Sequence, residues 1–455
     1  MLNKKIAKKV IPFAVISSLV IGGVVGVKQD TIQAKGEKQP KNVIFLIGDG
    51  MGESYMTAQR YMKDNPRTQG LDRTTFDKYK VGSQMTFPED DSQNITDSAS
   101  AATAMSAGVK TYNAAIAVDN DKSEVKTVLE AAKNKGKATG LVATSEITHA
   151  TPAAFGAHDE NRKNMNAIAD DYYDEKINGK HKIDVLLGGG SSNFNREDRN
   201  LAKEFKNDGF GYVTNKQDML KDKGDQLLGL FAPGGMPKAI DRTEEVPSLE
   251  EMTNTAINKL KKDKDGFFLM VEGSQIDWAG HDNDVVAALS EMDDFERAYK
   301  AAIDFAKKDG NTLVVTTADH STGGISVGSD GVYNWDPEPI KAAKRTPDFM
   351  SAEILKGADV ENTLRKYIDF DLTQEEIKSV QDAVATKKVD DAIEEIFNKR
   401  SFTGWTSGGH TGEDVPVYAF GPGKERFSGL IDNTDNARII FDILKDSNKH
   451  DKDKK

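Results

Sequence analysis

Residues 266–281 constrain the fold of this chain more than any other segment. A continuous apolar run, Phe267–Val271, is typical of a β-strand buried on both faces. Glu272, Asp277 and His281 follow it closely. Carboxylates are costly at the end of a buried strand unless a cation or hydrogen bonds compensate them. The segment therefore indicates either a metal site just beyond the strand, or a helix cap at Asp277 beside a solvated His281.

Apolar runs and helical segments alternate along the whole chain. The expected helices lie near residues 128–135, 248–262, 285–308 and 436–444. The expected strands lie near residues 43–47, 140–145, 184–187, 267–271 and 312–316. This alternation predicts an α/β fold, a three-layer αβα sandwich with a large, mostly parallel central sheet between helices.

The first 34 residues have the composition of an export signal. Basic residues precede an apolar stretch at residues 10–27, and Ala34 offers a small side chain at a cleavage point. This order predicts a cleaved signal peptide over residues 1–34, with an uncleaved membrane anchor as the alternative. We therefore expect a secreted, extracellular protein, with association to the cell wall or the membrane as the alternative.

The rest of the chain is expected to form one domain over residues 35–445. Residues 330–400 interrupt the alternation with a proline-containing loop and charged helical sequence, so we expect an insertion on the rim of the domain. The last segment, residues 446–455, consists mainly of lysine and aspartate and is predicted to be a disordered charged tail.

Charge and cysteine content exclude several classes of function. The chain has a formal net charge of −12, which argues against nucleic acid as a partner. It contains no cysteine, so disulfides, thiolate metal ligands and a cysteine nucleophile are excluded. An anionic substrate would need local positive charge, either from arginine or from bound cations.

Metal-binding residue types recur at the predicted strand ends. Asp49 follows the first strand, Asp319 and His320 follow the strand near residues 312–316, and His410 lies in a glycine turn before another apolar run. One such residue alone is more often a helix cap or a core residue, but parallel strands bring their carboxyl ends to one edge of the sheet. The mixture of carboxylates and imidazoles suits zinc, with magnesium beside it.

Two further residues could carry the chemistry. Ser98 lies at a predicted helix N-terminus, where backbone N–H groups and the helix dipole stabilise an alkoxide or a bound anion. Without nearby metals it would be an ordinary N-cap serine. Arg162 could hold two oxygens of a phosphoryl group at once, although a lone arginine is by default a surface residue.

Six motifs together resemble the alkaline phosphatase family, in that family's order and over residues 41–440. The motifs are Asp49-Gly-Met-Gly, Thr96-Asp-Ser-Ala-Ser-Ala-Ala-Thr-Ala, His149-Ala-Thr-Pro-Ala-Ala, Glu272-Gly with Asp277-Trp-Ala-Gly-His, Thr317-Ala-Asp-His and Gly409-His-Thr-Gly. The resemblance implies an exported, metal-dependent hydrolase of small phosphate monoesters with an alkaline pH optimum. It also implies a phosphoserine intermediate at Ser98 and a homodimer, with a monomer as the alternative.

The same resemblance implies two zinc ions and one magnesium ion. The implied ligands of the first zinc are Asp277, His281 and His410. Those of the second zinc are Asp49, Asp319 and His320. The third ion would be held by Thr151, Glu272 and the same Asp49, which bridges the second and third ions. Arg162, oriented by Asp97, would bind the phosphate oxygens.

The sequence departs from the enterobacterial members of the family at two positions. His149 replaces an aspartate, and as a softer ligand it would let the third site accept zinc or another divalent ion. Trp278 replaces a lysine near the phosphate and removes a positive charge there. We therefore expect weaker inhibition by phosphate than a lysine at this position would give.

Two other functions remain open from the residues. One is a related metal-dependent hydrolase of the same superfamily: a phosphodiesterase, a phosphonate hydrolase or a sulfatase. The other, from a different class, is a non-catalytic protein that binds metal or phosphate. Outside the motifs, His158 is expected to be structural, His181 to be solvated, and Trp405 to be a packing residue.

Overall fold

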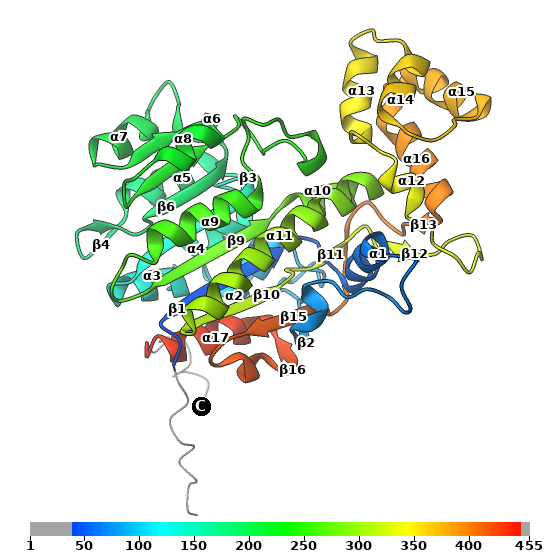
Figure 1. Cartoon of the computed structure of the whole chain (residues 1–455). Helices are drawn as coiled ribbons and strands as arrows, with labels where there is room; N and C mark the ends of the chain where they lie inside the picture. Colours follow the sequence, from blue (N-terminus) through cyan, green and yellow to red (C-terminus); the bar gives the residue numbers. More distant parts are fainter. Residues whose placement is uncertain (1–38, 447–455) are drawn as a thin grey trace, which may run out of the picture. The chain divides into compact units, whose positions relative to one another are not determined.

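The computed structural model describes residues 39–446, so the predicted signal peptide and residues 447–455 of the predicted tail lie outside it. A sheet of ten strands forms its centre, with helices on both faces (Figure 1). In spatial order the strands are β16 (Gly429–Asp432), β2 (Lys80–Met85), β15 (Val415–Phe420), β10 (Thr312–Thr317), β1 (Asn42–Gly48), β9 (Phe267–Gly273), β3 (Ala138–Glu146), β6 (Val185–Gly189), β8 (Leu227–Leu230) and β7 (Gly211–Val213).

The sheet is mixed, and most of its pairs are parallel. Only β15 runs antiparallel to its neighbours, β10 and β2. The five strands predicted from the sequence correspond to β1, β3, β6, β9 and β10, which form a contiguous block with β8 beside it. The prediction of a three-layer αβα fold with a large, mostly parallel sheet is therefore confirmed.

Alternate residues of β1 enter two different hydrophobic cores, which shows that both faces of the sheet are covered. Ile44 and Leu46 belong to one core, and Val43, Phe45 and Ile47 belong to the other. Helices that contribute to the first core are α1 (Glu53–Lys63), α9 (Leu249–Leu260) and α11 (Val285–Asp309). Helices that contribute to the second core are α2 (Ser98–Ala107), α3 (Val128–Asn134), α4 (Ala150–Gly156) and α17 (Asn433–Ile443).

Residues 338–401 form helices and contribute no strand to the ten-stranded sheet. These helices are α12 (Glu338–Lys341), α13 (Pro347–Leu355), α14 (Val360–Tyr367), α15 (Gln374–Ala383) and α16 (Val389–Ser401). Their position in the sequence agrees with the segment predicted as a rim insertion, and the domain boundaries remain a prediction. Within residues 39–446, no helix is long and apolar enough to cross a membrane.

The expectation that His181 is solvated is wrong. Its ring lies among Tyr173, Phe205 and Phe210, and its Nε2 is 2.8 Å from Asp208 Oδ2. Tyr173 lies on α5 (Met165–Asp174), while Phe205 lies on α7 (Leu201–Asn207) and Phe210 just after it, so the pattern around residue 181 alone did not indicate this environment. Trp405 is a packing residue as expected, because its ring packs edge-on against Tyr55 and its indole donates to Asn398.

Candidate active site

Four buried carboxylates meet at the carboxyl ends of the central parallel strands. Asp49 follows β1, Glu272 lies near the end of β9, and Asp319 follows β10. Asp277 lies in the first turn of α10 (Gln275–Asp282), the helix that follows β9. None of the four is more than 4 % exposed. Because β1 pairs in parallel with both β9 and β10, the fold itself brings these groups to one edge of the sheet.

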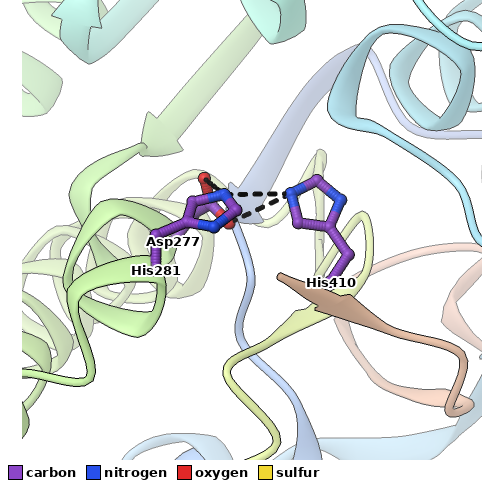
Figure 2. A group of neighbouring side chains, drawn as sticks. All are labelled: Asp277, His281 and His410. Atoms are coloured by element: carbon purple, nitrogen blue, oxygen red, sulfur yellow. Dashed lines mark hydrogen bonds and ion pairs between the residues drawn. The ribbon is translucent and has the colours of Figure 1, made fainter. Parts of the chain in front are cut away.

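Asp277, His281 and His410 form the first cluster (Figure 2). The Nε2 atoms of His281 and His410 are 3.2 Å apart, and each is within 3.5 Å of an Asp277 oxygen. The Nδ1 atoms instead face backbone carbonyls, of Gly408 at 2.8 Å and of Thr96 at 2.9 Å. Since a carbonyl only accepts, each Nδ1 carries a hydrogen, and in the neutral form of each ring the lone pair is then on Nε2, inside the cluster. This tautomer is the one that metal-binding histidines adopt.

The electrostatics of this cluster favour a positive charge between its members. The hydrogen bond with Asp277 raises the pKa of His281 to about 9. Burial, and then the neighbouring His320, lower the pKa of His410 to about 4. Burial alone would raise the pKa of Asp277, but its hydrogen bond with His281 and the neighbouring histidines hold it below its usual range. A cation at this point would interact with an ionised carboxylate and two imidazole lone pairs.

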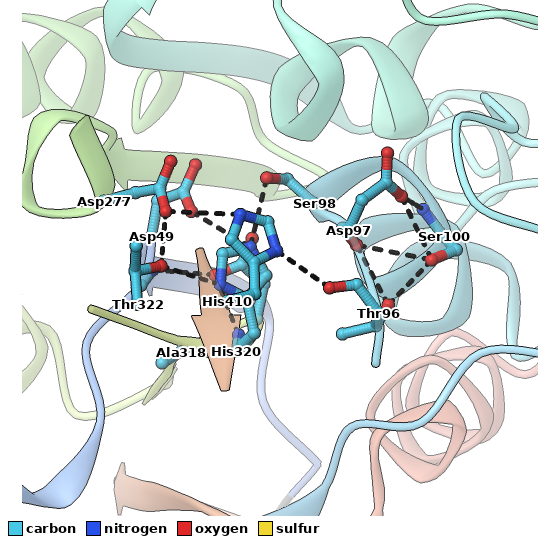
Figure 3. Close-up of polar contacts among 12 residues, drawn as sticks. Asp49, Thr96, Asp97, Ser98, Ser100, Asp277, Ala318, His320, Thr322 and His410 are labelled. Atoms are coloured by element: carbon cyan, nitrogen blue, oxygen red, sulfur yellow. Dashed lines mark hydrogen bonds and ion pairs between the residues drawn. The ribbon is translucent and has the colours of Figure 1, made fainter. Parts of the chain in front are cut away.

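The second cluster contains Asp49, Asp319 and His320, and Figure 3 shows Asp49 and His320 of this cluster beside Ser98. His320 Nε2 is 3.2 Å from Asp319 Oδ2, 3.5 Å from Asp49 Oδ1 and 3.2 Å from Ser98 Oγ. The other ring nitrogen of His320 is 3.2 Å from Thr322 Oγ1, and the Thr322 hydroxyl donates to Asp277 Oδ1. Thr322 thus connects the first cluster with the second.

In the third group, Thr151 of α4 and Asp49 both approach the Glu272 carboxylate. Ser274 Oγ donates to Glu272 Oε2 at 2.6 Å. Within residues 39–446, Thr151 Oγ1 and Glu272 Oε1 have no hydrogen-bond partner although both are buried. Both carboxylate oxygens of Asp49 and Asp319 Oδ2 likewise accept no hydrogen bond there, because His320 Nε2 lies near Asp49 Oδ1 and Asp319 Oδ2 without the geometry of a hydrogen bond.

These oxygens, which accept no hydrogen bond, indicate whether the residues fit metal ions. Buried polar atoms are normally hydrogen-bonded, because leaving one unpaired costs about 1–3 kcal/mol. Burial, and then Asp319, Asp277 and Glu272, raise the pKa of Asp49 well above its usual range. Burial also raises the pKa of Glu272 to about 7. Divalent cations would neutralise this charge and occupy the free oxygens, so the donor set fits the metals that the sequence implies.

Ser98 and Arg162, the predicted nucleophile and phosphate-binding residue, lie beside the clusters. Ser98 is the first residue of α2 and is buried, with its Oγ directed at His320. The N-cap of α2 is Asp97, which accepts from the Ser100 N–H at 3.0 Å, so the interpretation of Ser98 as an ordinary N-cap is wrong. The other Asp97 oxygen accepts from Arg162 at 2.9 Å. Asp97 therefore both caps the helix and orients the guanidinium.

His149 and Trp278 lie at the Arg162 side of the site. His149 Nε2 is 3.3 Å from an Arg162 nitrogen, and its ring lies edge-on to Trp278 at 5.8 Å. Burial, and then the charge of Arg162, lower the pKa of His149 to about 4, which keeps the imidazole neutral. Its Nδ1 is buried and without a partner within the part of the chain that the structure describes.

Sequence reasoning missed two residues that shape the site. Thr322 follows His320 by two positions, a spacing that places side chains on one face of an extended segment, and this signal could have found it. Gly235 lies under Trp278, and a Cβ there would come within 2.5 Å of two indole carbons. No local signal marked Gly235. His158 lies outside the site, as expected, with its Nε2 3.2 Å from the Val125 carbonyl.

A family model described as alkaline phosphatase matches residues 40–445 of the chain. The chain belongs to the alkaline phosphatase family. It is 67 % identical over 452 residues to "Alkaline phosphatase 3" of Bacillus subtilis, covering 97 % of this chain and 98 % of that one. This membership confirms the expected class of enzyme, a phosphoric monoester hydrolase of a metal-dependent family.

Solved structures agree with this assignment. A cold-active alkaline phosphatase from Shewanella sp. superposes with a TM-score of 0.84 at 38 % identity, covering 89 % of this chain and 99 % of that one. A variant of the enzyme from an Antarctic bacterium, in which a histidine is replaced by aspartate and magnesium is bound, superposes with a TM-score of 0.66 at 32 % identity, covering 90 % of this chain and 100 % of that one.

Proposed function

We propose that this member of the family hydrolyses small extracellular phosphate monoesters through a phosphoserine intermediate at Ser98. The observation that carries the proposal is the position of Ser98 Oγ, buried at the N-terminus of α2 and 3.2 Å from His320 Nε2. The four carboxylates beside it explain how an acidic chain can bind a phosphate: they would hold cations that reverse the local charge.

Two zinc ions and a third divalent ion fit the donor atoms. The first zinc would be held by Asp277, His281 and His410, and the second by Asp49, Asp319 and His320; Thr151, Glu272 and the bridging Asp49 would hold the third ion. When bound, these ions supply positive charge that activates the nucleophile and stabilises the entering and leaving oxygens of phosphoryl transfer.

The side chains of the protein bind and orient the phosphoryl group. Arg162 presents two guanidinium nitrogens on a side chain fixed by Asp97, an arrangement that suits two non-bridging phosphate oxygens. The N–H groups at the start of α2 and the helix dipole favour the deprotonated Ser98 oxygen as it attacks phosphorus. The ester oxygen leaves with the alcohol product. Water then attacks the phosphoserine, which frees Ser98 and releases inorganic phosphate.

His149 bears on the identity of the third ion. Magnesium prefers oxygen ligands, whereas a neutral imidazole favours zinc and other transition ions. In the related enzyme from an Antarctic bacterium, magnesium is bound when aspartate replaces a histidine. We therefore propose that the third site of this chain accepts zinc or another divalent ion as well as magnesium.

Export, oligomeric state and partners belong to the same proposal. Residues 1–34 support a secreted enzyme, and the family resemblance supports a homodimer, which sedimentation would distinguish from a monomer. The net charge of −12 argues against nucleic acid as a partner. The expected partners are small anions, which would bind next to the bound cations.

Replacing Ser98 with alanine tests the central claim. Ser98→Ala should abolish nearly all turnover of an aryl phosphate and all acid-trapped phosphoenzyme, while the bound metals measured by mass spectrometry stay unchanged. Ser106→Ala is the matched control, because Ser106 lies on the same buried helix but donates to the Ala154 carbonyl, away from the site. Equal turnover in the two variants would contradict the proposal. Faster hydrolysis of a diester, a phosphonate or a sulfate than of the monoester would favour the related hydrolases.

A further inference from the structure

The segments that lead into the central strands are rich in lysine. Strands β10, β1, β9, β3, β6 and β8 are successive neighbours in the sheet and all run parallel. Their amino ends therefore lie on one edge of the sheet, opposite to the edge that carries the candidate active site. We call this edge the basic edge, because thirteen lysines and six aspartates, and no glutamate or arginine, lie in the segments before five of these strands: residues 307–311, 259–265, 133–137, 178–184 and 221–226.

Hydrogen bonds join these segments into one surface. Lys137 Nζ donates to the carbonyl of Lys41, just before β1, at 2.8 Å and to that of Asp265, just before β9, at 2.6 Å. The Lys41 N–H donates to the Asn311 carbonyl, just before β10, at 2.7 Å. The starts of four neighbouring strands are thus connected side by side. At the usual strand spacing, the six strands span about 24 Å.

Most of the positive charge on the basic edge is not neutralised by ion pairs. Five of the thirteen lysines pair with an aspartate or a glutamate: Lys133, Lys182, Lys259, Lys262 and Lys307. The other eight form no ion pair with any residue of the range 39–446, against three such aspartates. Burial, and then the charge of Lys41, lower the pKa of Lys137, so like charges repel one another here. A bound anion would relieve this repulsion.

The basic edge also contains a cavity of about 560 Å³. Six lysines and four aspartates line it, and two of the aspartates, Asp184 and Asp225, are already paired with lysines. Lys137, Lys180 and Lys264 line the cavity without an ion pair and come from three different segments. Ammonium groups that converge in this way can contact the oxygens of one phosphodiester group.

The basic edge contrasts with the charge of the whole chain, which is −12. Four buried carboxylates lie at the opposite edge of the same sheet, in the candidate active site. A molecule with this distribution of charge turns its basic edge toward an anionic surface. Its candidate active site then faces away from that surface, toward the solution that contains the substrate.

We infer that the basic edge binds the surface of a lipid bilayer that contains anionic phosphodiester headgroups. The inference rests on the proposed export of the chain. The breadth of the edge, six strands, suits a surface better than a single polymer strand. The start of β1 also lies on this edge, and only fourteen residues separate it from the apolar stretch at residues 10–27. Fully extended, those residues span at most about 50 Å, so a chain whose apolar stretch is still in the membrane would hold the basic edge near the bilayer.

Co-sedimentation with lipid vesicles tests this surface. The protein is the processed chain, residues 35–455, saturated with zinc and magnesium; both hydrophobic cores lie within it. Inorganic phosphate is added to occupy the candidate active site. We expect binding to vesicles of equal parts phosphatidylcholine and phosphatidylglycerol, no binding to phosphatidylcholine alone, and release at high salt. Failure to bind the anionic vesicles would overturn the inference, and turnover of an aryl phosphate, measured on the same protein without added phosphate, tests the proposed function separately.

Substitution of lysines provides the decisive comparison. Each lysine close to an anionic bilayer contributes about fivefold to the affinity, so Lys180→Gln combined with Lys264→Gln should weaken vesicle binding at least about tenfold. Lys356→Gln combined with Lys387→Gln is the matched control, because these are exposed lysines of the helical residues 338–401 and the change in charge is the same. Turnover should be equal in the two double variants.

Two results of this comparison would contradict the inference. Equal affinity of the two double variants for the anionic vesicles would show that the basic edge does not bind them. Tighter binding to a soluble polymer of glycerol phosphate than to the vesicles would assign the basic edge to a polymer of the cell wall.

Discussion

The hydroxyl of Thr322 should control zinc affinity, because it connects two sets of metal ligands. It donates to Asp277 and lies 3.2 Å from His320 Nδ1, and the residue is fully buried. Thr322→Val keeps the shape of the side chain and removes both interactions. The Thr322 carbonyl, which accepts from the Tyr55 hydroxyl at 2.7 Å, is unaffected, so the backbone should stay in place.

The expected magnitude follows from the chemistry of the lost bonds. A hydrogen bond to a charged group contributes about 1.5–3 kcal/mol. Loss of a group that orients metal ligands typically lowers metal affinity about 10- to 100-fold, which corresponds to about 1.4–2.7 kcal/mol. The two estimates agree, and we expect the free zinc concentration at half-maximal activity to rise by one to two orders of magnitude.

The assay is reactivation of metal-free enzyme in zinc-buffered solution at fixed magnesium, with an aryl phosphate as substrate. Thr316→Val is the matched control, because Thr316 is also buried, on β10, and its hydroxyl has no partner in the part of the chain that the structure describes. Removing an unpaired buried hydroxyl should leave zinc affinity unchanged and stability equal or higher. If the two variants require the same free zinc concentration, Thr322 does not position the ligands and the reasoning fails.

Three further predictions follow from other parts of the molecule. Trp278→Lys should tighten inhibition by inorganic phosphate roughly fivefold, or about 1 kcal/mol, because an ammonium group would attract the product; weaker or equal inhibition in the variant would contradict this. Burial, and then Glu175, raise the pKa of Asp171 to about 6, so its contribution to stability is present below pH 4 and is lost as the pH rises through 6. The free energy of unfolding of Asp171→Asn should therefore rise by about 1 kcal/mol relative to that of the parent protein between pH 4 and pH 7.5. The expected rise is this small because the carboxyl is only partly buried. Urea unfolding at both pH values measures it, and a difference between the two proteins that does not change with pH would exclude it. Removing the metals with a chelator should lower the free energy of unfolding by about 2.7 kcal/mol for each ion previously present at 100 times its dissociation constant, measured by calorimetry.

The central strands could be predicted because their sequences contain the signal. Strands β1, β9 and β10 are apolar along nearly their whole length, since both faces are covered by helices. Strands β2 and β7 were missed because they lie near the ends of the sheet and are partly exposed, so their composition shows no clear apolar run. The identity of β2 as a strand depends on pairing with β15, which is far away in the chain, and that of β7 depends on pairing with β8, which follows after one short helix.

The sequence by itself determined which residues stand at the strand ends, and the order of the motifs around them. That information is local, since a buried strand and the polar residue that ends it lie within a few positions of each other. Only the tertiary structure decided that Thr322 joins Asp277 to His320, that Gly235 makes room for Trp278, and that the Thr96 carbonyl orients the His410 ring. These relationships depend on distances between segments that are separated by tens to hundreds of residues. Packing sets those distances, and hydrophobic periodicity does not encode them.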